Sequence, residues 1–165
     1  MAYGTDEGLT AWVTAQGLTM PVGANLTALR TVGSAYVDGA YEHRLACSAR
    51  TGGFTQELAF PRTGHFVNGQ AVPDDLIPQA WVNASYRAAF LQATNPGWAT
   101  NSTNPNRITV RERVDVIERE FAKASDLIGT ADVAAGMNAD GVINGMVAIW
   151  LCPTTRNPNS FFRVI

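Results

Sequence analysis

The chain has 165 residues with 12 basic and 14 acidic side chains, so its formal net charge is −2. Hydrophobic residues make up 46% and charged residues only 16%, against about 25% charged in an average domain, which excludes intrinsic disorder. The length fits one domain with arms, and the near-neutral charge excludes the strong basic excess of most nucleic-acid binders. A surface with so few charges suggests that neighbouring subunits cover part of it. Nearly all basic residues are arginine, whose weakly hydrated planar guanidinium is favoured at protein interfaces.

The N-terminus lacks the basic and apolar regions of a secretory signal, and the longest apolar stretch, 142–152, is about half of a membrane span. We therefore expect a soluble protein made in a reducing cytosol. Two cysteines, Cys47 and Cys152, can form neither a disulfide framework nor a four-ligand zinc site.

Two helices are predicted in the first quarter of the chain. Thr5 and Asp6 can cap a helix that stops at Gly17, where glycine can adopt the left-handed conformation. Asn25 or Thr27 can start the next helix, whose apolar positions follow the helical period as far as residue 41.

Two glycines interrupt the second helix. Gly33 and Gly39 each weaken it by about 1 kcal/mol relative to alanine. We expect a neighbouring element to approach the helix closely at both positions.

The middle of the chain predicts an extended segment and a third helix. Residues 54–60 alternate in polarity before Pro61, which is typical of a short strand or an extended arm entering a turn. A third helix begins near Pro78, carries Trp81 on its apolar face and stops at Asn95.

Residues 107–123 are ambiguous from propensity alone. Val110, Val114, Ile117 and Phe121 have heptad spacing, which favours a helix, whereas the β-branched alternation favours strands.

A last helix is expected over 142–151, with Asn138 or Asp140 as its cap and Pro153 as its end. The remaining residues form a tail rich in proline and asparagine that finishes in two phenylalanines. We therefore divide the chain into a domain over 1–152 and an extended C-terminal tail over 153–165.

Candidate catalytic and metal-binding residues are few. Asp38, Glu42 and His43 lie close in sequence, but on a helix they do not share one direction, so a solvated charged face is favoured over a metal site. The pair Asp74–Asp75 precedes the third helix, where acidic residues complement the helix macrodipole.

No phosphate-binding or dinucleotide-binding glycine motif occurs, and neither cysteine has a histidine near it in sequence. We expect no catalytic residue, no cofactor and no metal, so the chain is not predicted to be an enzyme.

Nucleic-acid binding has one candidate segment. Arg107, Arg111, Arg113, Arg119 and Lys123 form the densest basic run, but four acidic residues between them nearly cancel its charge. The tryptophans are widely spaced, and those at 12 and 81 lie on apolar helix faces. A mixed-charge face or an intersubunit strip of ion pairs is therefore favoured.

An ordered set of short motifs resembles a known family. Ala35-Tyr-Val-Asp38 precedes Gln56-Glu-Leu-Ala-Phe-Pro-Arg62, then Ile77-Pro78, an alanine-rich helix, and Ile117-Glu-Arg-Glu-Phe-Ala122 before an apolar C-terminal helix. This order resembles the head–tail connector (adaptor) proteins of tailed bacteriophages, over roughly residues 5–151. Members of that group are often labelled DnaT-like single-stranded-DNA-binding proteins.

The resemblance implies a mainly α fold of the α+β type: a small helical bundle with a short β-hairpin or extended arm and an extended C-terminal tail. It favours a β-hairpin over a helix in residues 107–123. The expected assembly is a homo-oligomeric ring, usually of twelve copies, beneath the portal.

The function implied by the resemblance is that of a structural virion protein. The chain would be made in the host cytoplasm and incorporated in the virion neck between capsid and tail, and it would contact the portal protein and a downstream neck or tail-completion protein. Duplex DNA would pass through the ring during genome packaging without specific binding, and no membrane is involved. The alternative is a DnaT-like single-stranded-DNA-binding accessory protein.

Two sets of residues are candidates for protein contacts. The tail offers aromatic and apolar anchors for a partner groove, and the basic run offers an intersubunit charge strip. The anchors are Phe161, Phe162, Arg163 and Ile165, and the strip comprises Arg111, Arg113, Asp115 and Arg119.

Overall fold

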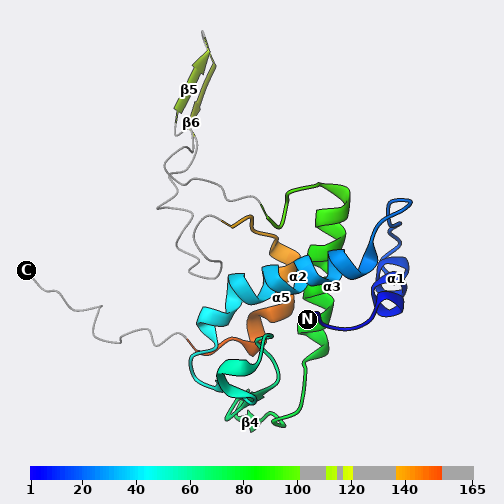
Figure 1. Cartoon of the computed structure of the whole chain (residues 1–165). Helices are drawn as coiled ribbons and strands as arrows, with labels where there is room; N and C mark the ends of the chain where they lie inside the picture. The colour runs from blue at the N-terminus through cyan, green and yellow to red at the C-terminus, as the bar shows by residue number, and fades with distance from the viewer. Residues whose placement is uncertain (101–110, 115–116, 121–136, 154–165) are drawn as a thin grey trace, which may run out of the picture.

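The computed structural model describes residues 1–100, 111–114, 117–120 and 137–153 (Figure 1). Its helices are α1 (Asp6–Ala15), α2 (Leu26–Tyr41), α3 (Gln79–Thr94) and α5 (Gly141–Val147). The predicted mainly α fold of the α+β type is confirmed. Within the described residues, no helix has the length and apolar character that crossing a membrane requires.

The predicted helix starts are confirmed by their caps. Thr5 Oγ1 accepts the Gly8 N–H at 3.0 Å, and Asn25 Oδ1 accepts the Ala28 N–H at 3.1 Å. Asp140 Oδ1 accepts two N–H groups of the first turn of α5, each at 3.0 Å. These side chains satisfy backbone donors that have no partner inside the helix.

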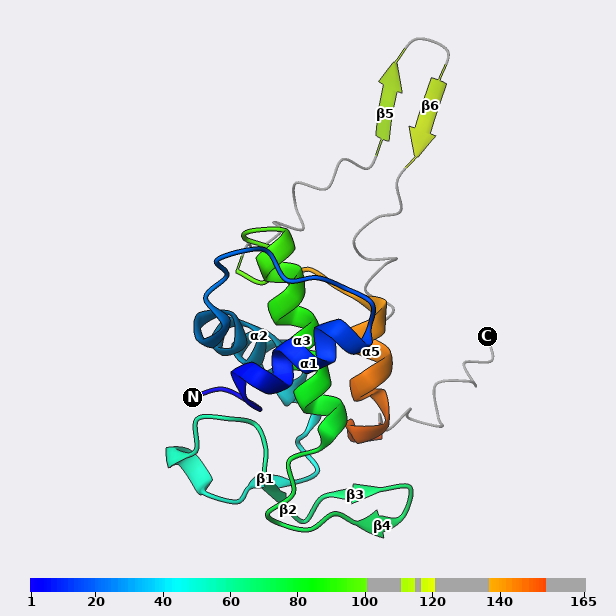
Figure 2. The same ribbon diagram turned by 90° about the vertical axis from the view of Figure 1, so that its right-hand side faces the viewer.

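The core lies where α2 crosses α3, with α5 packed on α3 beside them (Figure 2). Gly33 marks the crossing, since a Cβ there would lie 2.2 Å from the Ser85 carbonyl oxygen and 2.8 Å from the Ala89 nitrogen. The predicted close approach is thus confirmed at Gly33. It is wrong at Gly39, where a Cβ would have only an ordinary contact, 3.7 Å from Met137 Cε.

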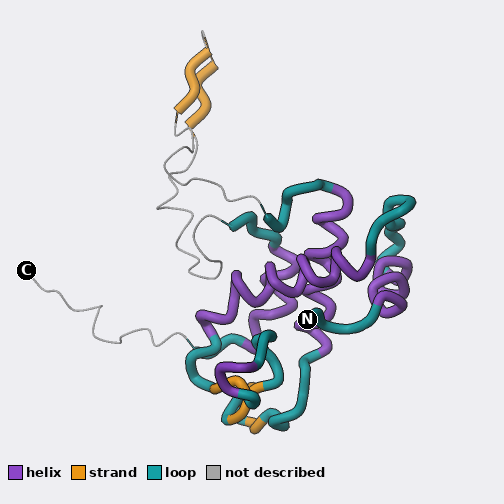
Figure 3. The backbone as a smooth tube through the Cα atoms, viewed as in Figure 1, coloured by secondary structure: helices purple, strands orange, loops and turns teal. Residues whose placement is uncertain are grey.

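Between α2 and α3 the chain is mostly loop with short strands (Figure 3). Strand β1 (Ala49–Arg50) pairs antiparallel with β2 (Arg62–Thr63), and β3 (Phe66–Val67) pairs with β4 (Gln70–Ala71). Of the two alternatives for residues 54–60, the strand is wrong: the 3₁₀ turn η2 (Gly53–Thr55) opens the segment, and the backbone of 58–60 bonds to side chains instead of a neighbouring strand.

The third helix and its surroundings differ from prediction in two details. Pro78 is the N-cap residue of α3 and lies just before the first helical turn. That first turn contains no acidic residue, because Asp74 and Asp75 lie in the preceding exposed turn. The macrodipole explanation for this pair is therefore wrong. Asn95 ends α3 as predicted.

Residues 107–123 contain the hairpin that the resemblance implies. Strand β5 (Arg111–Val114) pairs antiparallel with β6 (Ile117–Glu120), and neither pairs with β1–β4. Its register places each arginine position opposite a glutamate position: Arg111 opposite Glu120, Glu112 opposite Arg119 and Arg113 opposite Glu118. In residues 111–114 and 117–120 the strand pattern therefore prevails over the heptad spacing.

The end of the helical body is joined covalently to the loop that follows α2 and the 3₁₀ turn η1 (Glu42–Arg44). After α5 the chain makes the 3₁₀ turn η4 (Ala148–Trp150), and Cys152 forms a disulfide with Cys47, with Cα atoms 5.8 Å apart. The Cys152 N–H also donates to the Arg44 carbonyl at 2.9 Å. This pairing was not predicted, because the expectation of a reducing cytosol gave no reason to join cysteines 105 residues apart.

Candidate functional site

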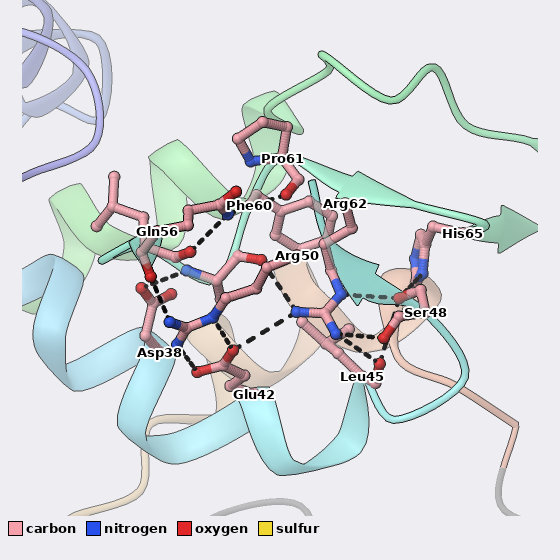
Figure 4. A network of polar contacts seen from close by, with 12 residues as sticks. Asp38, Glu42, Leu45, Ser48, Arg50, Gln56, Phe60, Pro61, Arg62 and His65 are labelled. Carbon is pink, nitrogen blue, oxygen red and sulfur yellow. Dashed lines mark hydrogen bonds and ion pairs between the residues drawn. The ribbon is translucent and has the colours of Figure 1, made fainter. Parts of the chain in front are cut away.

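The segment Gln56–Arg62, which carries the most specific motif of the chain, packs against the C-terminal end of α2 (Figure 4). It contains the one cis peptide bond recorded in the described chain, between Phe60 and Pro61. The polar side chains around it form a connected network of hydrogen bonds and ion pairs.

Asp38 is the inner end of this network. The residue is 9% exposed, and its carboxylate accepts hydrogen bonds from Tyr3 Oη at 2.8 Å, Trp81 Nε1 at 2.9 Å and the Ala59 N–H at 2.9 Å. Burial raises the pKa of Asp38, and the three donors oppose that rise. One side chain therefore joins the N-terminal segment, α2, α3 and the motif loop.

Arg62 holds the other end of the motif. Its guanidinium is buried and donates to three carbonyl oxygens, those of Ala59, Leu45 and Ser48, at 3.1, 3.0 and 2.6 Å. The Glu42 carboxylate lies 3.5 Å away. Five donors in a rigid plane suit this position, where lysine could not reach the same acceptors.

Glu42 and Gln56 connect the network to the surface. Glu42 accepts both Nε and Nη2 of Arg50 at 2.6 Å, and this bond raises the pKa of Arg50. Gln56 accepts the Gly52 N–H at 2.9 Å and donates to the carbonyls of Leu58 and Pro61 at 2.7 and 2.9 Å. The loop before the motif is thereby fixed at both ends.

Two members of the cluster weighed as a metal site or a solvated charged face, Asp38 and Glu42, belong to this structural network. Asp38 is buried, so the expectation of a solvated face is wrong for it, whereas His43 is exposed as expected. The described residues contain no group of three or more side chains placed to hold a metal ion.

One contact has the form of a nucleophile and its base. Ser48 Oγ lies 3.0 Å from His65 Nδ1, but it also accepts Arg62 Nε at 2.7 Å. His65 is 1% exposed, so its ring is shielded from solvent, and burial lowers the pKa of this histidine. Its ring packs edge-on against Phe60 and is stacked with Trp150, which is the environment of a core residue.

Two surface features are apolar. A groove of about 480 Å³ lies between the β3–β4 hairpin and η4, and it is here called the hairpin groove after that β3–β4 pair. Phe66 and Ile149 on its wall are each 60% exposed. The second feature is Phe54 on η2, whose side chain is fully exposed at 108%.

The structure describes three of the predicted contact residues and places them on one β-hairpin. Phe161, Phe162, Arg163 and Ile165 of the tail, and Asp115 of the charge strip, lie outside the described residues. Arg111, Arg113 and Arg119 lie on the β5–β6 hairpin. Their proposed roles stay predictions.

The structure defines a small helical protein with a two-stranded β-hairpin, β5–β6. A network of buried hydrogen bonds holds the segment Gln56–Arg62 against its helices. Residues 2–161 match the family described as "Putative DnaT-like ssDNA binding protein". Because the match spans nearly the whole chain, the protein belongs to this family. No curated protein and no solved structure matches the chain.

Proposed function

We propose that this protein is a structural virion component, a head–tail adaptor that assembles as a ring between the portal and the next neck or tail-completion protein. The proposal is carried by how the described residues use their charge. Four arginines, Arg30, Arg50, Arg62 and Arg87, face carboxylates of the same chain at 2.5 to 3.5 Å. Cations used in this way stabilise the subunit and neutralise no phosphates.

Exposed apolar side chains supply the complementary support. Phe54, Phe66 and Ile149 are presented to solvent while the charges are paired internally. Aromatic and aliphatic anchors on a neutral surface suit contacts with proteins. A ring with such subunits would let duplex DNA pass without gripping it, as a conduit requires.

The direct test is to locate the protein in purified particles of the phage that encodes it. Mass spectrometry of the particles should detect the chain, and cryo-electron microscopy should show a ring of it between portal and tail. Absence of the protein from purified particles would refute the proposal.

The tail gives a second test of the same function. Deleting residues 159–165 should reduce neck assembly while the circular dichroism and melting of the purified protein stay unchanged. The matched control replaces asparagines of the same tail, Asn157 and Asn159, by alanine and should assemble normally. Normal assembly by the truncated protein would remove the docking role of Phe161 and Phe162.

Binding of single-stranded DNA is the second candidate function, and the description of the family favours it. The available cations would come from the basic run that includes Arg111 and Arg113. Fluorescence anisotropy with a single-stranded oligonucleotide at several salt concentrations tests it, since each neutralised phosphate contributes about −0.7 to the log–log slope. Salt-dependent binding that is lost in the double variant R111Q/R113Q would favour this candidate over the adaptor.

A further inference from the structure

Phe54 is an aromatic side chain displayed in full to water. It lies on η2, between Gly53, whose φ is +63°, and Thr55, and its relative exposure is 108%. Aromatic residues are the commonest energetic anchors of protein interfaces. Exposure alone does not make an anchor, so the surrounding loop is the deciding feature.

The loop that carries Phe54 is held in place by its own polar groups. Gln56 accepts the Gly52 N–H at 2.9 Å, and Thr55 Oγ1 donates to the Gly52 carbonyl at 3.0 Å. At its base, Thr51 Oγ1 donates to the Asp74 carbonyl at 2.7 Å. A fixed loop presents the ring without losing conformational freedom on binding, which is the property of a preorganised anchor.

The hairpin groove has the matching properties. Its volume of about 480 Å³ is ample for one aromatic side chain, its apolar wall includes Phe66, Ile149 and Leu151, and the small residues at 64, 69 and 148 leave the backbone accessible. None of the residues lining the groove is ionisable, and neither is any residue of the loop 51–56. The loop 51–56 and the groove lining therefore carry no charge of their own, and the charged groups beside Phe54 are the mutually paired Glu42 and Arg50.

Phe54 and the groove lie on different sides of the subunit. In Figure 2, η2 lies at one side of the lower part of the molecule, whereas β3, β4 and the end of α5 lie at the other. Because the loop is fixed, Phe54 cannot enter the groove of its own chain. Two complementary surfaces at different places on one subunit produce a head-to-tail contact, which closes into a ring when its rotation allows.

We propose that Phe54 of one copy inserts into the hairpin groove of the next copy. This rests on the ring assembly of the proposed function and specifies one contact within it. The occupant is a second copy of this chain, and residues 161–165 of the tail are the competing occupant, since Pro153 lines the same groove.

Photo-cross-linking tests the contact directly. Phe54 is replaced by p-benzoylphenylalanine, the protein is mixed with a ¹⁵N-labelled copy at high concentration and irradiated, and cross-linked peptides are identified by mass spectrometry. We expect cross-links between light and heavy copies to residues 64–69 or 148–153. Intramolecular cross-links, cross-links to another surface, or none between copies would overturn the proposal.

Complementation of two variants gives an independent test. F54A retains the groove and I149E retains the anchor, so each alone should associate at least tenfold more weakly than the native chain in analytical ultracentrifugation. Their mixture should form a one-to-one dimer and nothing larger. V22A, at another fully exposed apolar position, is the matched control and should associate normally. Formation of larger assemblies by F54A, or of no dimer by the mixture, would refute the contact.

The outcomes also separate this inference from the function it refines. Rings of F54A in purified particles would overturn the contact and leave the adaptor function standing. Cross-linking between purified copies, combined with absence from particles, would support the contact and refute the adaptor. Cross-links from the tail to the groove, with none from residue 54, would assign the groove to the tail and overturn the contact.

Discussion

Gly33→Ala should destabilise the protein, whereas Gly39→Ala in the same helix should stabilise it. At Gly33 the new methyl carbon would lie 2.2 Å from the Ser85 carbonyl oxygen and 2.8 Å from the Ala89 nitrogen, both backbone atoms of α3. The nearest contact at Gly39 is 3.7 Å, and it is the flexible end of Met137. The two substitutions share the same change in helix propensity and differ in packing.

The magnitudes follow from these contacts. Replacing glycine by alanine inside a helix gains about 1 kcal/mol. Overpacking costs about 1–3 kcal/mol and more against rigid atoms, so the net loss at Gly33 should be about 2 kcal/mol. For a chain of this size the corresponding melting temperatures are about 4–8 °C lower for Gly33→Ala and about 2–4 °C higher for Gly39→Ala.

Thermal and denaturant unfolding followed by circular dichroism measures both variants. The critical result is the difference in unfolding free energy between the two variants. Both carry the same change in helix propensity, so an error in that propensity cancels in the difference. If Gly33→Ala were as stable as the native chain, or if both variants shifted in the same direction, the close crossing of α2 and α3 would be wrong.

Three further predictions concern the polar network and the disulfide. Asp38→Ala removes the acceptor of three buried donors at about 1–3 kcal/mol each, so we expect a loss of at least 3 kcal/mol in denaturant unfolding; a loss below 1 kcal/mol would contradict the network. The pKa of His65 is lowered in the folded chain, so below pH 6.5 the unfolded chain binds a proton at this residue and the folded chain does not. The unfolding free energy should therefore fall as the pH falls from 6.5 toward the lowered pKa, by at most about 1.4 kcal/mol per pH unit. His65→Gln should flatten this slope relative to the exposed control His43→Gln, and an unchanged slope would exclude His65 as its source. Cys152→Ser, or reduction of the native chain, should lower the unfolding free energy by about 2–4 kcal/mol, with equal stability of oxidised and reduced chains as the contrary result.

Local chemistry was sufficient to predict the helix starts, but not the end of the last helix: α5 ends at Val147 and continues as the 3₁₀ turn η4, whereas the sequence predicted a helix as far as residue 151. The caps at Thr5, Asn25 and Asp140 are decided within three residues, so a single sequence contains the necessary information. The hairpin at 111–120 required the family resemblance, because its β-branched residues also fit a heptad. Its cross-strand charge register becomes visible only once the turn position is known.

The internal network was misjudged because charged residues usually lie outside. Asp38 follows Ser34 by four residues and precedes Tyr41 by three, which places it on the buried stripe of α2. That spacing was a usable signal in the sequence. The donors that compensate its charge come from residues 3, 59 and 81, which no local pattern relates to it.

The disulfide was beyond prediction for the same reason. Its partners are separated by 105 residues, and only the folded path of α5 brings them together. The groove beside it, and its relation to Phe54 on the opposite side, likewise depend on how distant segments pack.

The junction at Cys152 also fixes where the C-terminal tail leaves the body. Bound to Cys47 by its sulfur and to the Arg44 carbonyl by its N–H, this residue acts as a stationary tether point. From Pro153 to Phe161 a fully extended chain spans at most about 29 Å. If the proposed docking of Phe161 occurs on the same subunit, the receiving surface must lie within that radius, and the length of the tail would set the effective concentration of the contact.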